Sequence, residues 1–198
     1  MEESTRQSMG KSEHAEWCTP PELLESVYKV GDVGLDPCSN LWSVVRSKKQ
    51  VMLPEDGLMV SWAEQAQGDI VFVNPPYGRQ VKTWVQKCVD EAANGAEVVL
   101  LVAARVDTKW FQELIFETAT AVCFLKGRVR FINALTGSQK DPSFFPSAVV
   151  YWGSNIDLFA DAFADKGHLM INFVEEPVVF EQPLAAPTSA RMASSWVV

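Results

Sequence analysis

The chain is short of the residues that build metal sites and disulfide frameworks. It has two histidines, and its four cysteines are widely spaced with no CxxC pair, so we expect reduced thiols and no bound metal. No apolar stretch approaches the ~20 residues that cross a bilayer, and the polar N-terminus lacks the pattern of a signal peptide. These absences argue against a membrane protein and predict a cytoplasmic location.

Basic residues are also in the minority. Acidic residues outnumber them by 25 to 17, which gives a net charge of -8 and argues mildly against nonspecific nucleic-acid binding, since phosphate neutralisation dominates that affinity. The basic residues nevertheless gather in the segments 46–49, 79–87 and 126–130. The sequence therefore leaves two interpretations of these segments: a basic cleft on one face of the protein, or ordinary solvated surface charge.

Length and composition indicate a single globular domain. The 198 residues are 47% hydrophobic and 21% charged, which is enough to bury one core. We expect a flexible segment over residues 1–14, a domain over 15–155 and a partly disordered extension over 156–198, where the periodicity fades and prolines accumulate. The sequence leaves the oligomeric state open.

Predicted strands and helices alternate along the domain. A first helix should begin with Thr19 as N-cap and Pro20 at its first position. The nearly all-apolar segment 97–104 is typical of a strand that is covered on both faces. Further strands are predicted at 33–36, 70–73, 121–125, 129–132 and 148–152, and further helices at 81–93, 110–118 and 157–163. This alternation predicts an α/β fold with a mostly parallel sheet and helices on both faces.

The most specific chemistry lies directly after the strand predicted at 70–73, in Asn74-Pro75-Pro76-Tyr77. An exocyclic amine on an aromatic ring is a poor nucleophile because its lone pair is delocalised, and two acceptors aimed at its protons can pull the nitrogen out of the ring plane. The Asn74 side chain and the Pro75 carbonyl suit this role, because proline fixes the backbone and removes a donor. Tyr77 adds a flat face on which a planar base can stack. The motif resembles the amine-methylating tetrapeptide of methyltransferases that depend on S-adenosylmethionine (SAM), and this resemblance implies amine methylation with SAM as the cofactor.

The position of the motif favours this interpretation over a plain turn at the end of a strand, because open α/β sheets bind ligands at the carboxyl ends of their strands. Three upstream segments suit the cofactor. Asp36-Pro37-Cys38 ends the first predicted strand, where the carboxylate would face the methionine ammonium. About 20 residues later, Asp56-Gly57-Leu58 lies where a carboxylate can meet ribose hydroxyls or the adenine amine. Thr19-Pro20 opens a helix whose free N–H groups suit the methionine carboxylate.

Together these segments resemble the N6-adenine DNA methyltransferases, especially the small phage-encoded, Dam-like group. The resemblance covers roughly residues 15–153 and rests on Trp17 to Glu22, Leu35 to Cys38, Asp56 to Leu58 with Trp62, Phe72 to Gly78, Arg105 to Phe111 and Gly127 to Phe131. It implies a Rossmann-like SAM-dependent methyltransferase fold and, if the protein is phage-encoded, a location in the host cytoplasm.

The resemblance also implies roles for particular residues. SAM would be contacted by the segments Trp17, Thr19-Pro20, Asp36-Pro37-Cys38, Asp56-Gly57-Leu58 and Asn74, and the target adenine would be held by Asn74 to Tyr77. One departure is that no glycine follows Asp36, so Ser39 and Asn40 must make the turn there.

The implied reaction is in-line methyl transfer to the N6 of an adenine flipped out of DNA, with DNA as the partner. The segment 133–146 could enter a groove, and six basic residues are candidates for phosphate contacts: Arg79, Lys82, Arg105, Lys109, Arg128 and Arg130. The alternatives are a glutamine-amide methyltransferase that acts on a protein, methylation of cytosine N4, and a SAM- or DNA-binding protein without catalysis. The intact motif argues against the last of these.

Overall fold

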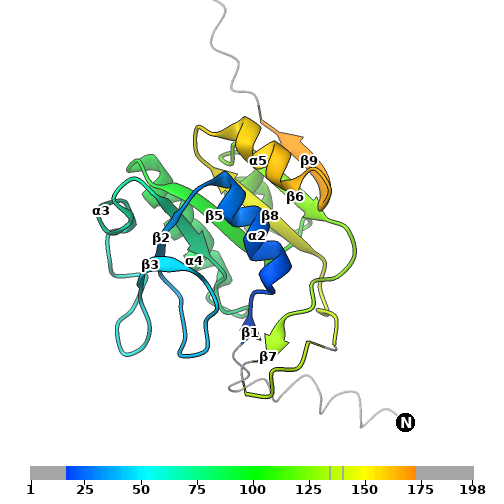
Figure 1. Cartoon of the computed structure of the whole chain (residues 1–198). Helices are drawn as coiled ribbons and strands as arrows, with labels where there is room; N and C mark the ends of the chain where they lie inside the picture. The colour runs from blue at the N-terminus through cyan, green and yellow to red at the C-terminus, as the bar shows by residue number, and fades with distance from the viewer. Residues whose placement is uncertain (1–16, 134, 140, 173–198) are drawn as a thin grey trace, which may run out of the picture.

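A seven-stranded sheet forms the centre of the molecule (Figure 1). The computed structural model describes residues 17–133, 135–139 and 141–172. In spatial order the strands are β3 (Ser47–Gln50), β2 (Val33–Asp36), β4 (Ile70–Val73), β5 (Glu97–Ala103), β8 (Ser147–Trp152), β6 (Ala121–Leu125) and β9 (Gly167–Ile171). A separate two-stranded sheet joins β1 (Trp17–Cys18) to β7 (Ile132–Asn133). The flexible segment predicted at 1–14 lies outside the described residues.

Five of the seven strands run in one direction. Strands β3, β2, β4 and β5 pair in parallel, whereas β8 lies antiparallel between β5 and β6, and β9 is antiparallel to β6. The fold is therefore mixed α/β, and the expected parallel pairing holds for the half of the sheet that runs from β3 to β5.

Helices cover both faces of this sheet. Helices α2 (Pro21–Val30) and α5 (Ile156–Phe163) lie over one face, and α3 (Trp62–Ala66), α4 (Val81–Ala93) and the π-helix η1 (Phe111–Phe116) cover the other (Figure 1). The side chains of β4 alternate between the two cores: Val71 and Val73 pack under α4, and Ile70 and Phe72 pack under α2. This period of two explains why the strand is apolar throughout. Among the described residues, no helix has the length and apolar character to span a membrane.

The predicted start of the first helix was wrong by one residue. Helix α2 begins at Pro21, and Pro20 occupies the N-cap position with an extended backbone, φ -67° and ψ 142°. A proline disfavours the helical conformation in the residue before it, so Pro21 keeps Pro20 out of the helix. Thr19 is therefore not the N-cap. The strand predicted at 129–132 is also reduced to the two residues of β7.

Residues 156–171, which we assigned to an extension, belong to the domain. Helix α5 buries Phe159 and Phe163 in the core that it shares with α2. Strand β9 extends the sheet, in a register that runs from Ala121 opposite Ile171 to Leu125 opposite Gly167. The folded unit therefore extends past residue 155.

The chain crosses the sheet in a way that marks one place for ligands. From β2 it passes to the edge strand β3 and then returns to the other side of β2 as β4. In open α/β sheets, ligands bind outside the carboxyl ends of the strands at such a switch point. Asp36 ends β2, and Asn74 directly follows β4. Both predicted segments therefore border the same switch point.

Candidate active site

Thr19 holds the side chain of Asn74. The amide nitrogen Nδ2 of Asn74 donates to Oγ1 of Thr19 at 3.1 Å, and Thr19 is only 2% exposed, so water competes little for this contact. The bond uses an N–H group and leaves the amide oxygen of Asn74 as an acceptor. The described residues donate no hydrogen bond to the Pro75 carbonyl. Two oxygen acceptors from adjacent residues are thus available at the end of β4.

Tyr77 presents an aromatic surface beside these acceptors. Its ring packs edge-on against Phe131, with centroids 5.9 Å apart, and the residue is 37% exposed. Burial of the hydroxyl, and then the neighbouring Cys38 thiol, raise the pKa of Tyr77, so the hydroxyl stays neutral at physiological pH. Of the two prolines before it, Pro75 is buried and Pro76 is exposed. The ring therefore extends from an anchored backbone and can offer a stacking surface.

Asp36 is a buried carboxylate at the end of β2. It is 4% exposed and accepts hydrogen bonds from the backbone N–H of Cys38 at 3.2 Å and from the Ser43 hydroxyl at 3.3 Å. Burial raises the pKa of Asp36 to about 6, although these hydrogen bonds oppose the shift. A neighbouring cation would favour the charged form. The position therefore suits the ammonium group of the methionine part of SAM.

The two predicted cofactor loops lie against each other. A Cβ atom at Gly57 would stand 1.7 Å from the carbonyl oxygen of Pro37, so only glycine allows this approach. Asp56 is exposed, and its carboxylate accepts the backbone N–H of Leu58 at 2.9 Å. Asp56 thus closes the turn that brings Gly57 against Pro37, and its contact with SAM stays a prediction.

Cys38 lies in the loop after β2, close to Asn74. Burial, and then the charge of Asp36, raise the pKa of the Cys38 thiol well above its usual range, while the nearby backbone of Asn74 opposes this shift. The turn that follows has no glycine, and the side-chain oxygen of Asn40 accepts the backbone N–H of Trp42 at 2.9 Å. A side-chain hydrogen bond therefore closes the turn, as is common for asparagine.

Trp17 is exposed and lies outside the central sheet. It belongs to β1, pairs with Asn133 of β7 and is 42% exposed. Two residues further along the chain is Thr19, which contacts Asn74.

The basic residues predicted to bind phosphates differ in their surroundings. Arg79 and Lys82 follow the Asn74 motif in the chain and are exposed, whereas Lys109 pairs with Glu113 at 3.4 Å.

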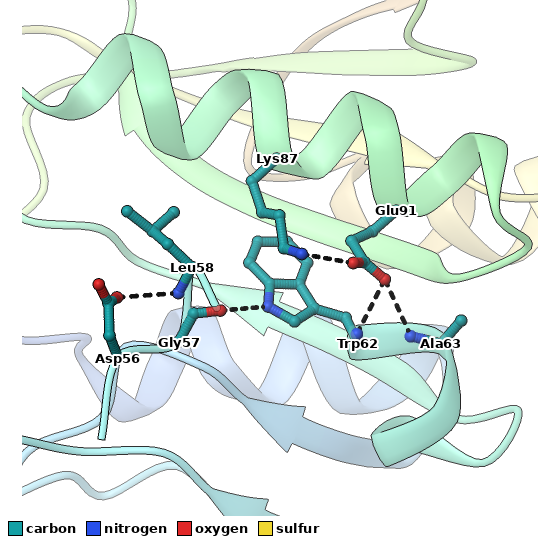
Figure 2. Close-up of polar contacts among 7 residues, drawn as sticks. All are labelled: Asp56, Gly57, Leu58, Trp62, Ala63, Lys87 and Glu91. Carbon is teal, nitrogen blue, oxygen red and sulfur yellow. Dashed lines mark hydrogen bonds and ion pairs between the residues drawn. The ribbon is translucent and has the colours of Figure 1, made fainter. Parts of the chain in front are cut away.

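A buried carboxylate that the sequence analysis missed anchors the 56–58 turn (Figure 2). Glu91 of α4 accepts the backbone N–H groups of Trp62 at 2.8 Å and Ala63 at 3.1 Å, and it pairs with Lys87 at 2.6 Å. The Trp62 indole N–H donates to the carbonyl of Gly57 at 2.7 Å. The sequence signal was only a Lys and a Glu four residues apart, which is typical of helix surfaces.

The described residues contain no group of three or more His, Cys, Asp or Glu side chains that could hold a metal ion. The structure describes all four cysteines, and none of them forms a disulfide bond. The polar groups gathered at the switch point are a carboxylate, an amide, hydroxyls and backbone carbonyls, and this set suits a cationic organic ligand better than a transition metal.

Comparison with known proteins identifies the family of the chain. The family model described as DNA N-6-adenine-methyltransferase (Dam) matches residues 6–164. The chain belongs to this family. The chain is also similar to a curated protein, the DNA N-6-adenine-methyltransferase of Haemophilus phage HP1 (strain HP1c1). The two are 24% identical over 147 residues, which cover 74% of this chain and 83% of the relative. The family resemblance inferred from the sequence is thus confirmed, and the match to the Dam family includes α5.

Proposed function

We propose that the chain transfers a methyl group from SAM to the N6 of adenine in DNA, on a Rossmann-like methyltransferase fold. The observation that carries the proposal is the pair of oxygen acceptors at Asn74 and Pro75, placed beside the buried Asp36 carboxylate at the switch point. Membership of the Dam family supports the same reaction. Because a relative is phage-encoded, we place the reaction in the cytoplasm of a bacterial host.

The loops around Asp36 would bind the cofactor. When bound, SAM supplies an electrophilic methyl group on a sulfonium centre. The Asp36 carboxylate would hold the methionine ammonium, because the buried charge gains most from a cationic partner. Gly57 packs against Pro37, so the turn at 56–58 would keep the adenosine end at a fixed distance from Asp36.

The Asn74 motif would orient the target amine. The two amine protons would be donated to the Asn74 side-chain oxygen and to the Pro75 carbonyl, which turns the nitrogen lone pair out of the ring plane and toward the methyl group. Thr19 keeps the Asn74 amide in this orientation, and Tyr77 stacks on the flipped base. Catalysis would then come from orientation and fixed dipoles, and not from a strong base.

Methyl transfer from labelled SAM tests the proposal, with DNA and a protein extract as parallel acceptors. We expect N6-methyladenine in the DNA digest. N4-methylcytosine, or label in glutamine side chains of protein, would overturn the adenine assignment and keep the amine-methylating chemistry. No transfer to either acceptor, with SAM still bound, would overturn catalysis itself.

Asp36→Asn is expected to weaken SAM binding by about 1–3 kcal/mol, because a charge-assisted contact is lost while the side-chain shape is kept. In the unchanged protein, affinity for SAM should be complete above the pKa of about 6 and fall as the pH drops through it, since protonation neutralises Asp36. The ligand amine stays protonated up to about pH 8. Calorimetry at several pH values measures both effects. Equal affinity in a folded Asp36→Asn variant would place the cofactor elsewhere.

Tyr77→Ala is expected to reduce kcat/KM on DNA by roughly 5- to 150-fold, because stacking contributes ~1–3 kcal/mol per base. Tyr77→Phe should keep most of the activity, since the aromatic face is retained and the neutral hydroxyl has no part in the reaction. SAM affinity serves as the control and should be the same in both variants. If Tyr77→Phe loses as much as Tyr77→Ala, the hydroxyl and not the ring face is what the site uses.

A further inference from the structure

Phe144 is more exposed than any other large hydrophobic side chain that the structure describes, at 91%. It lies in the loop 141–146, which precedes β8. A single exposed apolar residue is ordinary on a protein surface. The surroundings of Phe144 set it apart, because its backbone is anchored, two arginines contact its loop, and the loop lies at the carboxyl end of β5, the neighbour of the strand that leads to Asn74.

Hydrogen bonds hold the backbone on both sides of Phe144. The N–H of Ser143 donates to the carbonyl of Val129 at 2.8 Å, and the carbonyl of Pro146 accepts the N–H of Ala104 at 2.8 Å. The Arg128 guanidinium donates to the carbonyl of Phe144 itself. The loop therefore points an aromatic ring into solvent from a fixed backbone, which limits the entropy lost if the ring enters a partner.

Two guanidinium groups contact the loop that carries Phe144. The Arg105 guanidinium stands over the ring of Phe145, 4.3 Å from its centroid, and Arg128 is tied to the backbone of Phe144. Neither arginine forms an ion pair with a residue that the structure describes. An exposed aromatic ring on a loop that two arginines contact suits a nucleic acid, in which stacked bases lie between phosphates.

The same contacts place Phe144 near the predicted base pocket. Val129, which binds the loop through Ser143, is two residues from Phe131, and two residues span at most about 7 Å of extended chain. Phe131 in turn packs against Tyr77. On the other side of the loop, Ala104 directly follows β5, the neighbour of β4 in the sheet. Phe144 therefore lies on the side of the molecule to which Asn74 and Tyr77 belong.

We propose that Phe144 enters the DNA duplex beside the target adenine and fills the space that the flipped base leaves, while Arg105 and Arg128 bind the flanking phosphates. The inference rests on the proposed function, and it goes further by requiring a duplex as the substrate and by naming the residue that opens it. Extruding a base leaves its neighbours unstacked, and an inserted aromatic ring restores part of that stacking.

The test compares two duplexes that share one methylation site, which is first located by mapping the adenines that the unchanged protein methylates in plasmid DNA. In one duplex the target adenine is paired, and in the other it faces an abasic position, so that extrusion costs less. Phe144→Ala should lose at least ~10-fold in kcat/KM on the paired duplex, and most of this loss should disappear on the abasic one. Phe144→Trp should retain activity on both.

A matched control and a second signal separate insertion from a general defect. Leu158→Ala removes another exposed apolar side chain, on α5, and should leave both activities unchanged. With 2-aminopurine at the target position, the unchanged protein should raise the fluorescence on binding and Phe144→Ala should not. An equal loss on both duplexes, or no loss on either, would overturn the insertion. Absence of any DNA methylation by the unchanged protein would instead overturn the proposed function, before the variants are compared.

Discussion

Asn74→Ala is expected to reduce methyl transfer by at least ~100-fold and to change SAM affinity far less, because Asn74 is only one of several predicted SAM contacts. The variant removes one of the two acceptors that orient the target amine, and losing a single fixed dipole of this kind typically costs that much in kcat. The cofactor contacts predicted at Asp36 and Gly57 come from another loop and are kept. Single-turnover rates with saturating SAM, together with calorimetry, measure the two quantities separately.

Asn74→Asp is the matched control for this prediction. Aspartate keeps an acceptor oxygen, and the Thr19 hydroxyl can rotate and donate to it in place of accepting from the amide. The variant should therefore lose less activity than Asn74→Ala. A near-normal rate in Asn74→Ala would contradict the acceptor role, and an equal loss in both variants would mean that the amide nitrogen is the group that matters.

The centre of the fold could be predicted because its signals are local. Strand β4 and helix α4 have the predicted bounds, since an apolar run covered on both faces and a helical spacing of apolar residues are visible in sequence. The position of Asn74 at the end of a central strand followed from these two elements. The pairing of β8 between β5 and β6 could not, because strand order depends on contacts between distant segments.

The contact between Thr19 and Asn74 shows where sequence reasoning ends. A threonine before two prolines is a good N-cap candidate, and the cap was assigned on that pattern. The structure instead keeps Pro20 extended and turns the Thr19 hydroxyl to a residue 55 positions away. Strand β9 was missed for a related reason, because it is a half-buried edge strand whose partner β6 lies more than 40 residues earlier.

Glu91→Ala is expected to lower the free energy of unfolding by about 2–5 kcal/mol, since it leaves a buried backbone N–H group, a partly buried one and Lys87 without their acceptor. Glu91 is 4% exposed, and its removal frees the first turn of α3, where Trp62 binds Gly57. The loss should therefore be accompanied by weaker SAM binding at temperatures where the variant is still folded. Urea denaturation and calorimetry measure the two effects.

Glu91→Gln tests whether the charge of Glu91 stabilises the fold. Burial would raise the pKa of Glu91, but the hydrogen bonds from Lys87, Ala63 and Trp62 outweigh burial and lower it below the usual 4.5. A lowered pKa gives stability that is complete above pH 4.5 and is lost as the pH falls through the folded-state pKa. The difference in unfolding free energy between the unchanged protein and Glu91→Gln should therefore shrink below that pH. The raised pKa of Asp36 makes the stability depend on pH in the opposite direction, but Asp36 is present in both proteins, so its effect cancels in the difference.

The pair of Lys109 and Glu113 has the same spacing, with Glu113 in the π-helix η1, but it is exposed, so Glu113→Ala should cost less than ~1 kcal/mol. If Glu91→Ala cost no more than Glu113→Ala, the buried carboxylate would not hold α3 and α4 together. If Glu91→Ala were destabilised but bound SAM with unchanged affinity while folded, the bond from Trp62 to Gly57 would stabilise the fold without positioning the cofactor turn.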